Sequence, residues 1–114
     1  MNIVITGASG SGGSFLAEYI EKTKKKFNLY GISRWHSTST DSNLNNLKKI
    51  KMVECDLTDL SRILSVFKEI KPKYIFHLAS HANVRAGFDN PISVINNNIL
   101  STINILEAIK ILNL

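Results

Sequence analysis

The stretch that decides the fold runs from residue 3 to residue 13 and reads IVITGASGSGG. Its first four residues are β-branched, which is typical of a buried strand in a parallel sheet, apolar on both faces. The remainder is too rich in glycine for a helix or a strand and predicts a turn. A helical period follows, and it predicts that one apolar face carries Phe15, Leu16, Tyr19, Ile20 and Thr23.

The spacing of the glycines predicts a phosphate-binding turn between this strand and this helix. Gly7 can supply the positive φ of a tight turn, Gly10 leaves room for a pyrophosphate, and Gly13 lets the helix pack close to the strand. The N–H groups at the start of the helix then point at the phosphates. The turn also holds Gly12 and two hydroxyl donors, Ser9 and Ser11. It is not a Walker loop, because no Gly-Lys-Ser/Thr follows, and a merely structural turn is the alternative.

The rest of the chain continues the alternation of strands and helices. We expect strands at 29–32, 51–55 and 74–78, a helix from the cap Thr58 to Pro72, a loop at 79–90 and a last helix at 92–112. Residues 34–46 read as a polar loop, with room for a short helix near 44–47. This order predicts an α/β fold, the N-terminal half of a Rossmann-type doubly wound parallel sheet with four strands and crossover helices.

Composition excludes several classes of protein. The chain has 114 residues, 44% of them hydrophobic, and no apolar run of the roughly 18–20 residues that a membrane span needs. No signal-like segment is expected, and the lone Cys55 fits a reducing, cytoplasmic setting. The net charge is +5, but its lysine runs carry no interleaved aromatic residues, so we expect no nucleic-acid partner. The three histidines are too scattered to predict a metal site.

Residues 6–18, TGASGSGGSFLAE, resemble the start of the extended short-chain dehydrogenase/reductases, the NAD-dependent epimerase/dehydratase family, and within it the GDP-mannose 4,6-dehydratase branch. The resemblance continues through residues 31–34, 55–59, 72–84, 88–91 and 98–108 and so covers the whole chain. The sequence departs from the branch at three places: Gly12 replaces an acidic residue, residues 81–83 read His-Ala-Asn where Gln-Ser-His is usual, and Ser101 replaces a glycine. The sugar substrate therefore stays open among the dehydratases, epimerases and reductases of the family.

The residues at the end of the second strand indicate which nicotinamide cofactor is bound. That strand leads into Arg34, with no carboxylate before Asp41, and an arginine there accommodates the 2′-phosphate of NADP. NADP is therefore expected, with NAD as the alternative. The resemblance implies that Asp56 and Leu57 hold the adenine, although an aspartate in a turn is the alternative for Asp56. It also implies that the backbone of Leu78, Ala79 and Ser80 flanks the nicotinamide ribose, and His81 is expected at the same end of the sheet.

The catalytic pair of the family, Tyr-x-x-x-Lys, does not occur in these 114 residues. Tyr19, Tyr30 and Tyr74 are followed four positions later by threonine, arginine and leucine. We therefore expect residues 1–114 to be the N-terminal portion of an NAD(P)-binding domain, with no catalytic residue of its own and no activity alone. The sugar-nucleotide part of the family is also missing.

The resemblance implies a cofactor-binding segment of an NADP-dependent nucleotide-sugar 4,6-dehydratase, a lyase by outcome. Another nucleotide-sugar epimerase or reductase, or a non-catalytic dinucleotide-binding module, is the alternative. A nucleotide sugar is the expected substrate of the full-length protein. The last helix is apolar on more than one side, so we expect it to form a homo-oligomer or to be covered by the rest of the domain.

Overall fold

The computed structural model describes residues 1–23, 26–34, 49–80 and 84–114. Its strands are β1 (Asn2–Thr6), β2 (Asn28–Ser33), β3 (Ile50–Glu54) and β4 (Tyr74–His77). Its helices are α1 (Ser11–Lys22), α2 (Leu60–Ile70), α3 (Val84–Asp89) and α4 (Pro91–Leu112). All four expected strands lie within one or two residues of their predicted ends.

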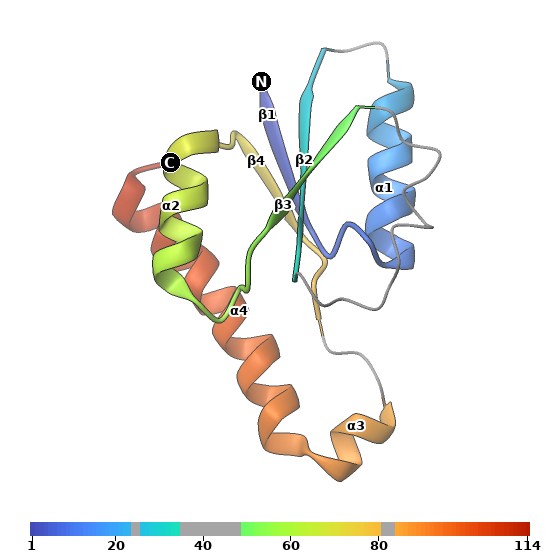
Figure 1. Cartoon of the computed structure of the whole chain (residues 1–114), viewed down its shortest axis with the longest axis vertical. Coiled ribbons are helices and arrows are strands. Elements are labelled where there is room, and N and C mark those ends of the chain that lie inside the picture. Colours follow the sequence, from blue (N-terminus) through green and yellow to red (C-terminus); the bar gives the residue numbers. More distant parts are fainter. Residues whose placement is uncertain (24–25, 35–48, 81–83) are drawn as a thin grey trace.

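The four strands form one parallel sheet in the order β3-β2-β1-β4. Helix α1 covers one face of this sheet, and helices α2 and α4 lie on the other (Figure 1). Strand β1 is central, and its last residue, Thr6, pairs with Ile32 on one side and His77 on the other. The expected half of a doubly wound Rossmann-type sheet is confirmed, and the order places the carboxyl ends of all four strands at one edge.

Successive side chains of β1 point to opposite faces of the sheet, so they pack alternately into the two apolar layers. Ile3 and Ile5 pack with residues of α1, whereas Val4 belongs to the larger cluster that α2 and α4 complete. This larger cluster includes Ile63, Phe67, Ile105 and Ala108. Both faces of β1 are therefore buried, in agreement with its uninterrupted β-branched sequence.

The predicted apolar face of α1 is wrong at its aromatic positions. Phe15 and Tyr19 are 73% and 70% exposed, and the buried residues of the helix are Gly13, Ser14, Ala17 and Ile20. Small side chains line this face because the start of the helix lies against the backbone of the preceding turn. A pattern of large apolar residues does not detect a face built for such close packing.

Helix α2 does not begin at the predicted cap. Its N-cap is Asp59, whose side chain accepts a hydrogen bond from the backbone N–H of Arg62 at 3.2 Å. Thr58, one residue earlier, does not cap the helix, and its N–H and hydroxyl both donate to Asp56. The predicted loop at 79–90 is also wrong in part, since it contains the short helix α3. Of the loop expected at 34–46, only Arg34 lies within the described residues.

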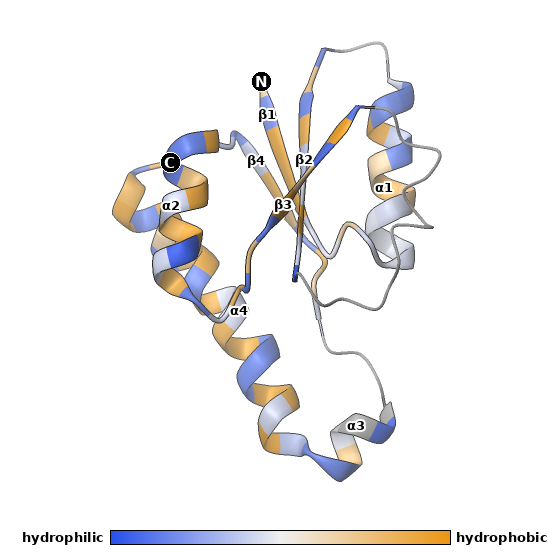
Figure 2. Cartoon of the chain, viewed as in Figure 1, coloured by the Kyte–Doolittle hydropathy of each residue, from blue (hydrophilic) through white to orange (hydrophobic). Residues whose placement is uncertain are grey.

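Helix α4 presents an apolar stripe to solvent, visible as orange turns along its length in Figure 2. The stripe consists of Ile92, Ile95, Ile99, Ile103 and Leu106, all between 47% and 71% exposed. Its buried face instead carries Ser101, Asn104, Ile105 and Ala108. The expected unpartnered face is therefore present in the described chain. No helix among the described residues is long and apolar enough to cross a membrane.

Candidate functional site

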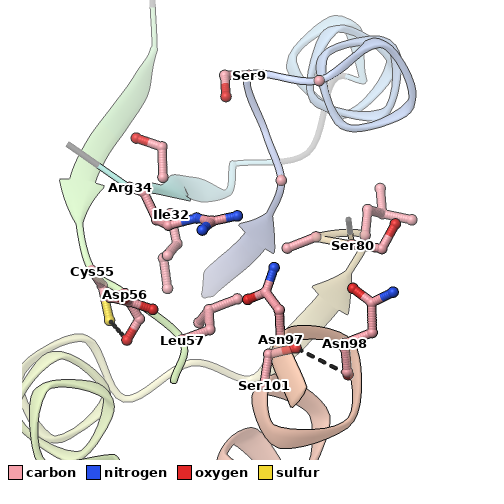
Figure 3. A pocket seen from close by; sticks show the side chains of 15 residues that line it. Ser9, Ile32, Arg34, Cys55, Asp56, Leu57, Ser80, Asn97, Asn98 and Ser101 are labelled. Carbon is pink, nitrogen blue, oxygen red and sulfur yellow. Dashed lines mark hydrogen bonds between the residues drawn. The ribbon is translucent and has the colours of Figure 1, made fainter. Parts of the chain in front are cut away.

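A cavity of about 230 Å³ lies at the carboxyl ends of the strands, and we call it the strand-end cavity (Figure 3). Its walls come from the segment that follows each strand and from the middle of α4. In a parallel sheet of this order, ligands bind in the crevice where neighbouring crossovers leave in opposite directions. Here α1 leaves β1 toward one face, and the chain after β4 leads to α4 on the other.

The turn from β1 to α1 forms the wall nearest the start of the helix. Gly7 has a φ of 69°, and its carbonyl oxygen accepts a hydrogen bond from the N–H of Gly10 at 3.0 Å. Gly10 is the N-cap of α1, and no side chain caps the helix. The first turn also lacks an acidic residue. The positive end of the helix dipole is therefore available to an anion at the cavity.

The glycines of the turn differ in how much space surrounds them. A Cβ on Gly13 would overlap the carbonyl group of Gly7, so the helix starts in direct contact with the turn. A Cβ on Gly10 would lie 3.3 Å from the same carbonyl oxygen, and one on Gly12 would meet nothing within 4 Å. The expected role of Gly13 in close packing is confirmed, as is the positive φ of Gly7.

Two charged residues face the cavity from the ends of neighbouring strands. Arg34 follows β2 and extends its guanidinium into the cavity (Figure 3). Asp56 follows β3, and its Oδ1 accepts hydrogen bonds from the N–H and the hydroxyl of Thr58 at 2.9 and 2.8 Å. Asp56 is thus a turn aspartate, but the described residues give its Oδ2 no hydrogen bond. That oxygen can accept from an amino group of a ligand.

The segment after β4 forms the wall opposite Arg34. Leu78, Ala79 and Ser80 all line the cavity, and the N–H groups of Leu78 and Ala79 both donate to the hydroxyl of Thr6 at 3.1 Å. This wall is therefore fixed to β1 by side-chain as well as backbone bonds. His81, expected at the same place, lies outside the described residues.

Cys55 lines the cavity and His77 lies next to it, but neither side chain is suited to acid–base chemistry. Burial raises the pKa of the Cys55 thiol to about 11, so the thiol is protonated at neutral pH. Burial lowers the pKa of His77, and both ring nitrogens are hydrogen-bonded to threonine hydroxyls. No group of His, Cys, Asp and Glu able to hold a metal occurs in the described part of the chain.

The structure brings most of the predicted site residues together. Those that line the strand-end cavity are Gly7, Ser9, Gly10, Arg34, Asp56, Leu57, Leu78, Ala79 and Ser80. Ser11, Gly12 and Gly13 do not line it, because they lie in the first turn of α1, with Gly13 buried beneath the turn. That any of these residues holds a cofactor stays a prediction.

Sequence reasoning did not assign six of the lining residues to the site: Ile32, Ser33, Cys55, Asn97, Asn98 and Ser101. The first three end strands that were predicted, so the rule that sites lie at carboxyl ends could have found them. The asparagines had a signal too, since three in a row at 96–98 interrupt an otherwise apolar helix. Asn97 and Asn98 supply the amide groups of the α4 wall in Figure 3.

The family model for GDP-mannose 4,6 dehydratase matches residues 4–114. The chain belongs to this family. It shares 29% identity with the GDP-mannose 4,6-dehydratase of Vibrio cholerae over 119 aligned positions, which is 97% of this chain and 32% of the relative. The chain thus spans about a third of the length of the curated relatives that it matches.

Solved structures with the same fold include nucleotide-sugar epimerases. The UDP-glucose 4-epimerase of Thermotoga maritima, solved with UDP-glucose, has a TM-score of 0.82 and 26% identity, over 96% of this chain and 34% of that one. The UDP-glucose 4-epimerase of Thermus thermophilus in complex with NAD has a TM-score of 0.85 and 24% identity, over 99% of this chain and 35% of that one. The family is therefore one of nucleotide-sugar dehydratases and epimerases.

Proposed function

We propose that the strand-end cavity binds a nicotinamide dinucleotide. The observation that carries this proposal is the uncapped N-terminus of α1, which opens into the same cavity as Arg34 and Asp56. The pyrophosphate lies against the amides at the start of α1, since an anion there gains both hydrogen bonds and the helix dipole. Adenine lies between Asp56 and Leu57, with its amino group donating to Asp56 Oδ2.

The dinucleotide is NADP in this proposal. Arg34 reaches into the cavity from the end of β2, the position that faces the adenosine ribose in this fold. Its guanidinium offers charge-assisted hydrogen bonds to a 2′-phosphate, and no carboxylate of β2 opposes that phosphate. NAD is the alternative, because NAD is the ligand of the T. thermophilus epimerase, which has the same fold.

For the whole protein we propose an NADP-dependent nucleotide-sugar 4,6-dehydratase, in which these residues form the N-terminal portion of the cofactor domain. The match to the dehydratase family and its V. cholerae relative supports this choice. A 4-epimerase is the second candidate, favoured by the solved structures. The 114 residues hold no Tyr-x-x-x-Lys pair, so the segment alone is proposed to be inactive.

The exposed stripe of α4 supports a homo-oligomer of the full-length protein, since a continuous apolar helix face is stabilised by a partner. The expected cytoplasmic location also remains a proposal. Neither a nucleic acid nor a membrane is proposed as a partner.

A titration with NADP⁺ and NAD⁺, followed by the backbone amide resonances of the chain, tests the dinucleotide site. We expect the amides of residues 10–13 to shift with either nucleotide, and those near Arg34 to shift further with NADP⁺. Crystals soaked with NADP⁺ should show the pyrophosphate beside Gly10 and Gly13. Shifts or density confined to another part of the chain would disprove the proposal.

A further inference from the structure

The imidazole of His77 joins three elements next to residues that line the strand-end cavity. Its Nδ1 lies 2.7 Å from the hydroxyl of Thr6 at the end of β1. Its Nε2 lies 3.1 Å from the hydroxyl of Thr102 on α4. His77 itself ends β4. One side chain therefore connects the two strand ends and the helix that wall the cavity.

The bonds at Thr6 determine which ring nitrogen carries the proton. The backbone N–H groups of Leu78 and Ala79 both donate to Thr6 Oγ1, each at 3.1 Å. A hydroxyl oxygen has two lone pairs, and these two donors point at both, with the Leu78 N–H shared between this oxygen and the Thr6 carbonyl oxygen at 3.3 Å. The hydroxyl proton of Thr6 must therefore be donated to His77, so Nδ1 is the acceptor and carries no proton.

The bonds at the other end lead to the same tautomer independently. The hydroxyl of Thr102 lies 3.1 Å from the carbonyl oxygen of Asn98, which can only accept. Thr102 therefore donates to Asn98 and accepts from the ring, so Nε2 carries the proton. The proton order runs without conflict from the Leu78 and Ala79 amides through Thr6, His77 and Thr102 to Asn98.

This network fixes residues that line the cavity. Leu78, Ala79 and Asn98 are wall residues, and the backbone near Ala79 is packed against the glycine turn. A Cβ on Gly7 would lie 2.8 Å from the backbone nitrogen of Ala79, so the two segments have no room to approach further. A displacement of the β4 exit would therefore change both the wall and its contact with the turn.

A second proton on His77 is incompatible with this arrangement. It would place an N–H opposite the Thr6 oxygen, which already accepts two hydrogen bonds. Among the described residues, the groups hydrogen-bonded to the ring are the uncharged hydroxyls of Thr6 on β1 and Thr102 on α4. Burial, the cause of the lowered pKa, acts in the same direction by favouring the neutral ring.

We propose that His77, as the neutral Nε2–H tautomer, is a positioning residue that locks the exits of β1 and β4 to α4 and thereby holds the Leu78–Ser80 wall in place. It acts through Thr6 and Thr102 without touching the ligand. The statement that this wall faces a dinucleotide rests on the proposed function. The geometry of the wall in the absence of ligand is independent of that function.

The tautomer can be read from the ¹⁵N shifts of the histidine rings in the 114-residue chain, with His77 assigned by its loss in His77→Asn. We expect a neutral ring protonated at Nε2, with its protonation midpoint below that of a solvated histidine. A ring protonated at Nδ1, or an ordinary midpoint with fast ring exchange, would overturn the proposal. The tautomer and the midpoint are both measured on the wild-type chain without ligand.

Two substitutions then separate positioning from general stability. His77→Asn keeps an acceptor for Thr6 at the place of Nδ1, whereas His77→Leu removes it. We expect slow hydrogen exchange at the Ala79 amide in wild type and in His77→Asn, and exchange at least tenfold faster in His77→Leu. Thr102→Val should release the α4 end, seen as a shift of the Asn98 resonances, while Thr102→Ser should not. Equal exchange at Ala79 in all the variants would overturn the proposal.

NADP⁺ affinity distinguishes this inference from the proposed function. With the network in place, affinity should fall as the pH drops through the protonation midpoint of His77. The fall should be smaller in His77→Asn, which keeps only the part caused by protonation of the 2′-phosphate of the ligand. Affinity that follows the His77 midpoint supports both proposals. The same pH dependence in wild type and in His77→Asn overturns the positioning role, whereas no binding at any pH with an intact Nε2–H tautomer overturns the dinucleotide proposal alone.

Discussion

Gly13 packs directly on the carbonyl group of Gly7, six residues earlier in the chain. This contact sets the angle at which α1 leaves the sheet and brings the helix N-terminus to the strand-end cavity. The expected result of Gly13→Ala is a loss of about 1–3 kcal/mol of unfolding free energy, because the new methyl group would displace backbone atoms. Urea denaturation measures the loss.

Gly12→Ala is the matched control for this prediction, since it lies in the same turn of α1 but faces open space. It should leave stability unchanged or raise it by up to about 1 kcal/mol, because alanine favours a helix over glycine. If both substitutions had the same effect, the contact between Gly13 and Gly7 would not be the cause.

Asp59→Ala should lower the urea midpoint of the chain more than Thr58→Val does, because Asp59 and not Thr58 caps α2. The hydrogen bonds from the N–H of Arg62 and from Ser61 hold the pKa of Asp59 below its ordinary value. A depressed pKa means that the unfolded chain binds the proton more readily. The contribution of the Asp59 carboxylate to folding stability is therefore present above pH 3.8 and is lost as the pH falls below this value.

Denaturation midpoints measured at a series of pH values, for wild type and Asp59→Ala, check this dependence. The gap between the two proteins should be full near neutral pH and should close in acid. A gap that stays constant through this range would mean that the carboxylate of Asp59 is not the stabilising group.

How much could be predicted from sequence depends on whether the signal is local. The strands were predicted because β-branched runs such as 3–6 carry their own pattern. The buried face of α1 was not predicted. Its small residues are required by close packing on the backbone of the turn, and a search for periodic large apolar residues does not detect them. The walls that contain Arg34, Asp56 and Leu78 could be predicted because these residues follow the ends of strands. The α4 wall could not, because it depends on where a helix more than 60 residues beyond Arg34 lies in the folded chain.

Ile99→Lys on the stripe of α4 should change the stability of the chain by no more than about 0.5 kcal/mol, because the side chain is 54% exposed. Ile105→Ala, on the buried face of the same helix, should cost about 2–5 kcal/mol. If the stripe mediates self-association, Ile99→Lys should also shift sedimentation velocity profiles toward the monomer. Unchanged self-association in Ile99→Lys would exclude the stripe as the interface.

Arg34→Ala should weaken NADP⁺ binding by about 1–3 kcal/mol and leave NAD⁺ binding unchanged, because the guanidinium is proposed to bond the 2′-phosphate that NAD lacks. Isothermal titration with both nucleotides measures the two effects in the same protein. Lys68→Ala is the control for a general loss of positive charge, since Lys68 is exposed on α2 and does not line the cavity. Equal weakening of both nucleotides by Arg34→Ala would show that Arg34 contacts a part that they share, such as the adenine or the pyrophosphate. The choice of NADP over NAD would then lose its support.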